Sequence, residues 1–310
     1  MRPSLHLPTM TEDLSNIHLS KAEFQEYGYR LVDWLAEYFD NVDQYQVLPS
    51  IEPGDIRNML PVSAPERAES MDEIIDDLDR VVMPGVAHWQ HPGWYAFFPS
   101  GASPVSALGE FVAAGLATQG MMWSTAPAAT EIENTVLDWL VDLLGLPSSW
   151  RLDEGPGGGV IQMSASDSTH LSLAVARHQF ELSGADANSL VAYGSSQAHS
   201  SIEKGARIAG FKHIRSVPVT QTFGIDTDAF VRIVRDDIDS GLTPAWVCSA
   251  VGTTNTTAMD PIRAIAAIAS ENGMWHHADA AYAGSAMICP EFRELQDCLL
   301  YTSPSPRDRV

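Results

Sequence analysis

The segment AWVCSAVGTTNTTAMDPIRAIAAIASENGMWHHAD, residues 245–279, decides the fold. It opens with an apolar run at 245–251 and closes with another at 274–278, and both runs have the length of a strand. Between them, apolar residues recur at helical spacing over 261–272, so the segment predicts a strand–helix–strand unit. Two strands joined by a crossover helix lie parallel in one sheet.

The same alternation extends upstream. We expect further strands at 160–163, 190–193 and 214–217, and further helices at 168–182, 200–209 and 227–240. Repeated strand–helix units predict an α/β fold, a mostly parallel sheet with helices on both faces. Ligands of such sheets bind beyond the carboxyl ends of the strands. Candidate site residues are therefore sought directly after each strand.

The N-terminal third has a helical pattern instead. Ser20 with Glu23, and Ser70 with Glu73, form capping-box signatures that predict one helix after residue 20 and another through residue 82. Thr130 predicts the start of a third helix, which ends at Gly145. Residues 47–66 are rich in proline and turn formers and predict an extended linker.

These patterns divide the chain into four parts. We expect a disordered N-terminus at 1–19, a helical arm with its linker at 20–100, and a partial large α/β domain at 101–298. Residues 299–310 lack periodicity and are typical of translated adapter sequence after a truncated reading frame, so they are left out of the fold. The sequence does not distinguish Met1 from Met10 as the true start.

Charge and composition exclude several classes of protein. The net charge of −22 would repel nucleic acid and anionic membranes, so neither is expected as a partner. No apolar run is long enough to span a bilayer, and the first twenty residues do not resemble a signal peptide. Three cysteines without metal-type spacing fit a reducing compartment, so we expect a cytoplasmic protein.

Two segments at predicted strand ends could hold an anionic or planar ligand. The Gly-rich stretch 157–159 leads into small and hydroxyl residues at 164–169 that open a helix, where free amides favour a phosphate. An ordinary N-cap explains the same residues equally well. His199 precedes the next helix and could stack on a ring or move a proton, although most histidines at such junctions have no catalytic task.

Asp279 is the third candidate, because it ends an apolar strand and small residues follow it. A carboxylate there can keep a ring nitrogen protonated, so that the ring accepts electrons. A metal site is the competing interpretation. However, His276 and His277 are adjacent and point to opposite faces of a strand, and no further ligands with zinc spacing are apparent, so no metal is expected. A structural role for Asp279 also stays open.

Taken together, the motifs of the chain resemble the group II pyridoxal-phosphate (PLP) decarboxylases, most closely the aromatic-L-amino-acid decarboxylases. They follow the family's order from about residue 20 to residue 295, and this ordered set is far more specific than any one motif. The motifs are His88–Pro92, Phe97–Ser100, Met122–Ser124, Thr130–Glu133, Ser164–Thr169, Ala198–Ser201, Gly252–Thr254 and His277–Glu291.

The resemblance implies a fold-type-I, PLP-dependent transferase-like homodimer whose N-terminal helices wrap around the partner subunit. It also implies PLP as the cofactor, with His199, Thr254 and Asp279 in catalytic roles. The cofactor contacts that it assigns are Ala165 and Ser166 to the phosphate, His199 and Ala281 to the two ring faces, and Asp279 to the ring nitrogen, with Thr254 near the cofactor's hydroxyl and Asp279.

The substrate implied is an amino acid with an aromatic side chain: tryptophan, tyrosine or dihydroxyphenylalanine. No Arg or Lys occurs in 88–101 or 118–124, so a second substrate carboxylate would be buried unpaired. Without the resemblance, the aromatic residues among these could simply be core. The residues that match the family's substrate pocket are Trp89, Phe97, Phe98, Pro99 and Ser100, with Gln119 and Met121 offered to the neighbouring subunit's site.

One feature departs from the family pattern. The family's cofactor lysine lies in an Asn-Pro-His-Lys-Trp-like segment that would follow residue 295, whereas the three lysines here are Lys21, Lys204 and Lys212. We therefore expect the chain as written to be inactive or nearly so. Three hypotheses stay open: part of an aromatic amino-acid decarboxylase, a related PLP enzyme that decarboxylates acidic amino acids or forms aldehydes oxidatively, and a non-enzymatic fragment that dimerises.

Overall fold

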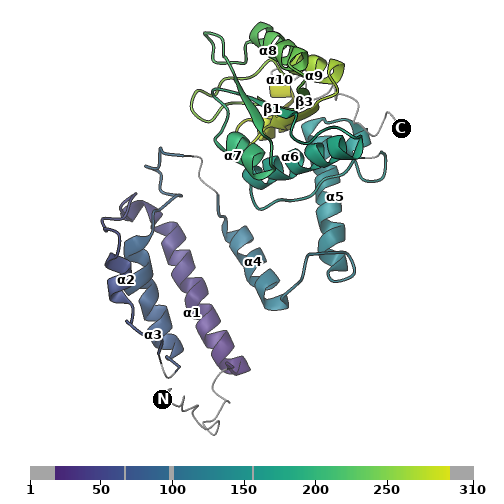
Figure 1. Cartoon of the computed structure of the whole chain (residues 1–310). Coiled ribbons are helices and arrows are strands. Elements are labelled where there is room, and N and C mark those ends of the chain that lie inside the picture. The colour runs from purple at the N-terminus through teal and green to yellow at the C-terminus, as the bar shows by residue number, and fades with distance from the viewer. Residues whose placement is uncertain (1–17, 66–67, 98–100, 156, 294–310) are drawn as a thin grey trace, which may run out of the picture. The chain divides into compact units, whose positions relative to one another are not determined.

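The computed structural model describes residues 18–65, 68–97, 101–155 and 157–293. The chain forms two compact units, divided between Thr118 and Gln119 (Figure 1).

The first unit is helical. It contains α1 (Lys21–Asp40), α2 (Asp55–Met59), α3 (Met71–Asp77) and α4 (Pro104–Leu116). The capping boxes predicted at Ser20 and Ser70 are confirmed, since each serine accepts the amide of the glutamate three residues on. A π-helical turn at Leu78–Val82 continues α3, and short 3-10 turns lie at Val42–Gln44 and Met83–Gly85. The predicted extended linker was wrong in part, because α2 interrupts it after Gly54, and α4 was not predicted.

Polar contacts join α1 to the segment around α3. Arg30 pairs with Asp72, and the Trp34 indole Nε1 donates to Asp79 at 3.0 Å. Further along the helix, the Tyr38 hydroxyl lies 3.1 Å from Nδ1 of the buried His88. Arg30, Trp34 and Tyr38 follow one another at one-turn intervals, so these contacts hold one face of the second half of α1.

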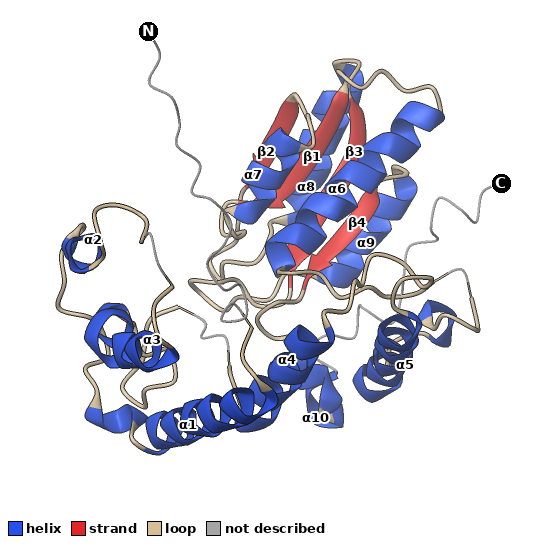
Figure 2. Ribbon diagram, turned by 90° about the horizontal axis from the view of Figure 1, so that it is seen from below, coloured by secondary structure: helices blue, strands red, loops and turns tan. Residues whose placement is uncertain are grey.

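The second unit contains a four-stranded parallel sheet. Its strands are β1 (Leu190–Ser195), β2 (His213–Val217), β3 (Thr243–Ala250) and β4 (Trp275–Asp279), in the order β2-β1-β3-β4. All three strand pairs are parallel (Figure 2). The predicted strands at 190–193, 214–217, 245–251 and 274–278 are confirmed to within two residues at each end.

Helices cover both faces of this sheet (Figure 2). On one face, α6 (Ala165–Leu182) and α7 (Ser201–Ile208) pack on a core that includes Leu190 and Trp246. On the other, α8 (Thr227–Asp239) and α9 (Ile262–Glu271) pack on the alternate strand residues, including Val191 and Tyr193. The remaining elements are α5 (Pro127–Leu144), α10 (Pro290–Arg293) and 3-10 turns at Ser148–Trp150 and Gly284–Ile288.

Two predicted boundaries and one predicted strand are wrong. Residues 160–163 form no strand; the Ile161 amide donates to Glu133 at 2.7 Å instead of to a neighbouring strand, and Val160 and Ile161 are exposed. Helix α6 begins at Ala165 rather than at 168, because Ser164 is its N-cap. Helix α5 begins at Pro127, a favourable first residue, so Thr130 lies inside its first turn and bonds the Ala126 carbonyl.

Candidate functional site

The carboxyl ends of the strands bring three predicted site segments to one edge of the sheet. His199 follows β1, Thr254 follows β3, and Asp279 is the last residue of β4. Strand β3 lies between β1 and β4, so His199 and Asp279 flank the loop that carries Thr254. The strand ends therefore bring a histidine, a threonine and a carboxylate to the same edge of the sheet.

Asp279 is oriented by its own turn. Its Oδ1 accepts the amide of Ala281 at 3.2 Å, and its carbonyl accepts the amide of Val251 at 2.8 Å. The register places Asp279 opposite Ala250 of β3. Ala281, the residue predicted to pack on a ring, is exposed directly beyond this carboxylate. Asp279 thus offers a fixed, half-buried anion next to a small side chain.

The start of α6 lies at the same edge. Thr169 contacts His277 near the carboxyl end of β4, whereas Ser172, one turn later, contacts Trp246 further back in β3. The helix therefore runs away from the edge, and its first residues, Ala165 and Ser166, lie at the edge or beyond it. Amides in a first helical turn have no intrahelical carbonyl to bind, so they are available to an anion.

Ser164 caps that helix start. Its hydroxyl accepts the amide of Asp167 at 3.2 Å and donates to the Asp167 carboxylate at 2.9 Å. The N-cap predicted as the ordinary explanation of this segment is therefore present. The cap occupies the Asp167 amide and not the amides of Ala165 and Ser166, so the same helix start can be capped and also bind an anion.

His199 is held by the start of α7. Its Nδ1 lies 2.9 Å from the Ser201 hydroxyl and accepts the Ser201 amide at 3.3 Å. Because Nδ1 is an acceptor, the neutral ring carries its proton on Nε2. The side chain is exposed at the sheet edge, which suits a ring that stacks on a ligand or exchanges a proton.

Thr254 belongs to a closed loop. The Thr253 amide donates to the Ala258 carbonyl at 3.0 Å, and the Thr253 hydroxyl lies 2.6 Å from that of Thr256. At its base, buried Asp260 accepts the amides of Ala250 at 2.7 Å and Ile225 at 2.8 Å. Burial raises the pKa of Asp260, while these two hydrogen bonds oppose the shift. The loop holds Thr254 out at the edge, where it is exposed.

Two partly buried histidines lie just behind Asp279 on β4. Burial lowers the pKa of His276 to about 4, and its Nε2 lies 2.7 Å from the buried Ser249 hydroxyl. Burial also lowers the pKa of His277, although the nearby Asp279 opposes that shift. Both rings are therefore neutral near pH 7. In the part of the chain that the structure describes, no three His, Cys, Asp or Glu side chains gather as metal ligands.

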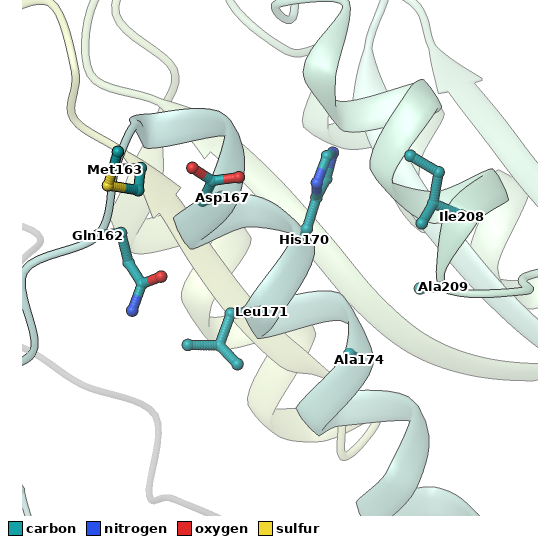
Figure 3. Close-up of a pocket in the computed structure, with 8 residues that line it drawn as sticks. All are labelled: Gln162, Met163, Asp167, His170, Leu171, Ala174, Ile208 and Ala209. Atoms are coloured by element: carbon teal, nitrogen blue, oxygen red, sulfur yellow. The ribbon is translucent and has the colours of Figure 1, made fainter. Parts of the chain in front are cut away.

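A separate hollow lies on the outer surface of α6. Figure 3 shows the residues that line it: Asp167, His170, Leu171 and Ala174 of α6, Ile208 and Ala209 at the end of α7, and Gln162 and Met163 from the segment before α6. It contains none of the strand-end residues, and its lining is mainly apolar. We therefore do not assign the cofactor to it.

The predicted substrate residues are divided between the two units and a segment outside the described residues. Trp89 and Phe97 lie in the first unit, where both are exposed and their ring centroids are 6.1 Å apart. Phe97 has a positive φ of 56°, an uncommon conformation for an aromatic residue. Gln119 and Met121 are exposed at the start of the second unit. Phe98, Pro99 and Ser100 lie outside the described residues.

Several supporting residues were missed from the sequence. Thr169 and His277 link α6 to β4, and Asp260 closes the Thr254 loop. At the same edge, Gly252 has a φ of 85°, and a Cβ there would lie 2.2 Å from the Tyr282 ring. The sequence shows an aspartate, Asp260, soon after the predicted strand. It does not show the two amides that this aspartate binds, because the tertiary fold brings them together.

A parallel sheet with helices on both faces defines an α/β protein whose ligand site is expected at the carboxyl ends of the strands, where a helix start, a histidine and a carboxylate gather. Residues 53–302 match the pyridoxal-dependent decarboxylase conserved domain, and the chain belongs to that family. Its fold is accordingly the PLP-dependent fold type I predicted from the motifs, and PLP is the cofactor of the family.

Named relatives cover nearly all of this chain. An aromatic-L-amino-acid decarboxylase of Catharanthus roseus is 42% identical over 285 residues, which are 90% of this chain and 57% of the relative. A phenylacetaldehyde synthase of Arabidopsis thaliana is 41% identical, over 90% of this chain and 58% of the relative. The chain thus spans less than 60% of the length of either protein.

A solved structure gives the same match. The TDC of Oryza sativa, solved with PLP and tryptamine, superposes with a TM-score of 0.88 at 38% identity. The match covers 92% of this chain and 60% of that one.

Proposed function

We propose that this chain is the cofactor-binding part of a PLP-dependent decarboxylase of aromatic L-amino acids. The observation that carries the proposal is the joint position of the α6 start, His199, Thr254 and Asp279 at one sheet edge. Family membership and the names of the relatives support it.

The residues at this edge suit PLP in chemistry and size. The amides of Ala165 and Ser166, which have no intrahelical acceptor, suit the phosphate, and the Asp279 carboxylate suits a protonated pyridine nitrogen. Bound there, PLP would supply an electron sink for the bonding pair that remains at the substrate's Cα when carbon dioxide leaves. Asp279 would keep the ring nitrogen protonated, His199 would lie against the ring, and Thr254 would bind the ring hydroxyl.

Ligand binding tests the Asp279 assignment in the chain itself. Pyridoxamine 5′-phosphate is the suitable probe, because it needs no lysine. We expect Asp279→Asn to weaken its binding at least ~10-fold, the loss of one charge-assisted hydrogen bond. Asp236→Asn, the same change at an exposed position of α8, should bind as the wild type does. Equal affinities of all three proteins in calorimetry would contradict the assignment.

The proposal includes a cofactor lysine outside residues 1–310. Lys21 lies on α1, and Lys204 lies on the surface of α7, where its Nζ is 3.3 Å from the Ser200 hydroxyl. Lys212 is exposed just before β2. Borohydride reduction with PLP should therefore leave no stoichiometric pyridoxyl group at any of them. Peptide mass spectrometry that finds such a group at Lys204 would refute this part.

Substrate choice is tested in the enzyme that contains these residues and the remaining length of the relatives. We expect carbon dioxide release from tryptophan, tyrosine or dihydroxyphenylalanine at least ~100-fold faster than from glutamate. The reason is that segments 88–101 and 118–124 contain no cation for a second carboxylate. Efficient glutamate turnover would overturn the substrate class and leave the cofactor assignment in place.

Oxidative formation of an aldehyde is the second candidate, favoured by the 41% identity to the phenylacetaldehyde synthase. Simple decarboxylation gives an amine and carbon dioxide. The oxidative reaction consumes dioxygen and water, and gives the aldehyde, carbon dioxide, ammonia and hydrogen peroxide. An oxygen electrode separates the two, since only the second consumes oxygen in proportion to carbon dioxide.

We further propose that the protein is a cytoplasmic homodimer. Several apolar side chains of α1 and α4 are exposed, among them Phe24, Leu108 and Val112, as expected of helices that a second subunit covers. No helix in the described part of the chain is long and apolar enough to cross a bilayer. Sedimentation at several protein concentrations tests the dimer.

A further inference from the structure

Four side chains form a closed set of contacts between α6 and the sheet, which we call the α6 anchor: Thr169 and Ser172 on α6, Trp246 on β3 and His277 on β4. His277 Nε2 lies 3.4 Å from the Thr169 hydroxyl, and the His277 ring stacks on Trp246 with centroids 5.5 Å apart. The Trp246 indole donates to the Ser172 hydroxyl at 3.2 Å, and that hydroxyl donates to the Thr169 carbonyl at 2.9 Å.

The direction of these hydrogen bonds is fixed by the hydroxyl of Thr169. It donates its single proton to the carbonyl of Ala165 at 3.1 Å, so it must accept from His277 Nε2. Thr169, Ser172 and Trp246 are all buried. His277 is thus a neutral donor. Its acceptor, the Thr169 hydroxyl, is itself hydrogen-bonded to the carbonyl of Ala165, the first residue of α6.

The anchor connects two ends of the candidate cofactor site. His277 lies two residues before Asp279 on β4, and Thr169 lies one turn after Ala165. The contact between them therefore sets the separation between the amides that face the phosphate and the carboxylate that faces the ring nitrogen. A rigid ligand that must reach both ends binds best when this separation is held.

We propose that His277 is a positioning residue, which holds the phosphate-binding start of α6 at a fixed distance from Asp279 through Thr169. This inference rests on the proposed function for the identity of the ligand, but the anchor itself is a property of the chain. The simpler alternative is a histidine that only stabilises the core. The two differ in what a broken anchor does to ligand recognition.

Isosteric variants of Thr169 make the matched test. Thr169→Val keeps the shape of the side chain and removes the hydroxyl, whereas Thr169→Ser keeps the hydroxyl. His277→Gln keeps an N–H donor and removes the ring. Each protein is titrated with pyridoxamine 5′-phosphate and with pyridoxamine, and the ratio of the two affinities measures what the phosphate adds to binding.

We expect that ratio to fall about tenfold in Thr169→Val, equal to about 1.4 kcal/mol, and to stay within about twofold of wild type in Thr169→Ser. His277→Gln should lie between them. If the contact only stabilised the fold, Thr169→Val would have a lower melting temperature and the wild-type affinity ratio. That result would overturn the positioning role.

Hydrogen exchange without ligand separates this inference from the proposed function. In Thr169→Val we expect faster amide exchange both at residues 165–169 and at residues 277–281, with α8 unchanged. Faster exchange in a protein that binds neither ligand would overturn the proposed function and confirm the anchor. Exchange that is unchanged at either end would overturn the anchor, whatever the chain binds.

Discussion

Asp237 accepts hydrogen bonds from two side chains where α8 packs on the sheet. The buried Tyr193 hydroxyl donates to Oδ2 at 3.0 Å, and Arg215 donates to both oxygens, with Nη2 at 2.6 Å from Oδ1. Burial raises the pKa of Tyr193, so it is a neutral donor, and the Arg215 charge is the partner that compensates the buried carboxylate.

Removing that buried charge should destabilise the second unit. We expect Asp237→Asn to lower the free energy of unfolding by about 2 kcal/mol, since it leaves Arg215 without its ion pair in a partly buried place. Asp236→Asn, next to it but exposed, should change the stability by less than about 0.5 kcal/mol. Urea denaturation of both variants gives the comparison. Equal midpoints would show that the pair contributes nothing.

Gly252 permits the close approach of Tyr282 at the sheet edge. Its φ of 85° disfavours any side chain, and a Cβ would lie 2.2 Å from the Tyr282 Cδ1 atom. Gly241 is a useful control, because it has a φ of 79° and no neighbouring atom lies within 4 Å of the place that a Cβ would take. The two glycines therefore share the backbone strain and differ in the contact.

We predict that Gly252→Ala costs at least about 1 kcal/mol more than Gly241→Ala in unfolding free energy. The backbone cost cancels in the difference, and the overlap with Tyr282 remains. Denaturant titration of the two variants measures it. A larger cost at Gly241 would mean that Tyr282 moves aside freely, and that the loop before Thr254 is not held by this contact.

At the scale of elements, the N-cap of α6 both stabilises the helix and shapes the candidate site. Ser164→Ala removes the hydroxyl that accepts the Asp167 amide, and we expect a loss of about 1 kcal/mol. Ser164→Thr retains a capping oxygen and should recover most of that stability. Thermal unfolding of the three proteins checks the order, and a Thr variant as unstable as the Ala variant would contradict a capping role.

Elements with local signals were predicted well from the sequence. The two capping boxes and the apolar runs of β1 to β4 depend on neighbours a few residues away, so the pattern contains the information. Residues 160–163 have the same apolar pattern as a strand, but a strand also needs a partner, and pairing is not encoded locally.

The candidate site was likewise predicted where the signal is local and missed where it depends on the tertiary fold. Asp279 and His199 were predicted as candidates because they follow strand patterns, and the structure places both at the carboxyl edge. The partners of His277 and Asp260 were not predictable, since they are brought together by the packing of α6 and by the β3 loop. The roles assigned to the site residues stay predictions.

For the whole molecule, the two adjacent histidines of β4 predict a dependence of stability on pH. The pKa of folded His276 is about 4, below its ordinary value of 6.5, so between these values the unfolded chain binds more protons. The free energy of unfolding should therefore fall as the pH is lowered through this window. Protonation of His277 in the unfolded chain acts in the same direction, because burial lowers its pKa as well.

Replacing His276 should flatten that dependence. We expect His276→Gln to reduce the slope by on the order of 1 kcal/mol per pH unit between about pH 6 and pH 4.5. His178→Gln, at an exposed position of α6, should retain the wild-type slope. Urea midpoints at several pH values measure both. A slope that is unchanged in His276→Gln would show that another group dominates acid unfolding.

The strand order has a consequence for how the sheet assembles during synthesis. Strand β1 leaves the ribosome first and pairs with β2, the next strand of the chain, but its other neighbour is β3, about fifty residues further on. Until β3 has been synthesised, the backbone groups on one side of β1 have no strand to pair with, although every residue of β1 is buried in the folded unit. Each later strand, β3 and then β4, extends the sheet on that same side. Because each strand pairs with residues distant in the sequence, we expect this unit to fold slowly, with nascent chains that end before β3 the most prone to aggregate.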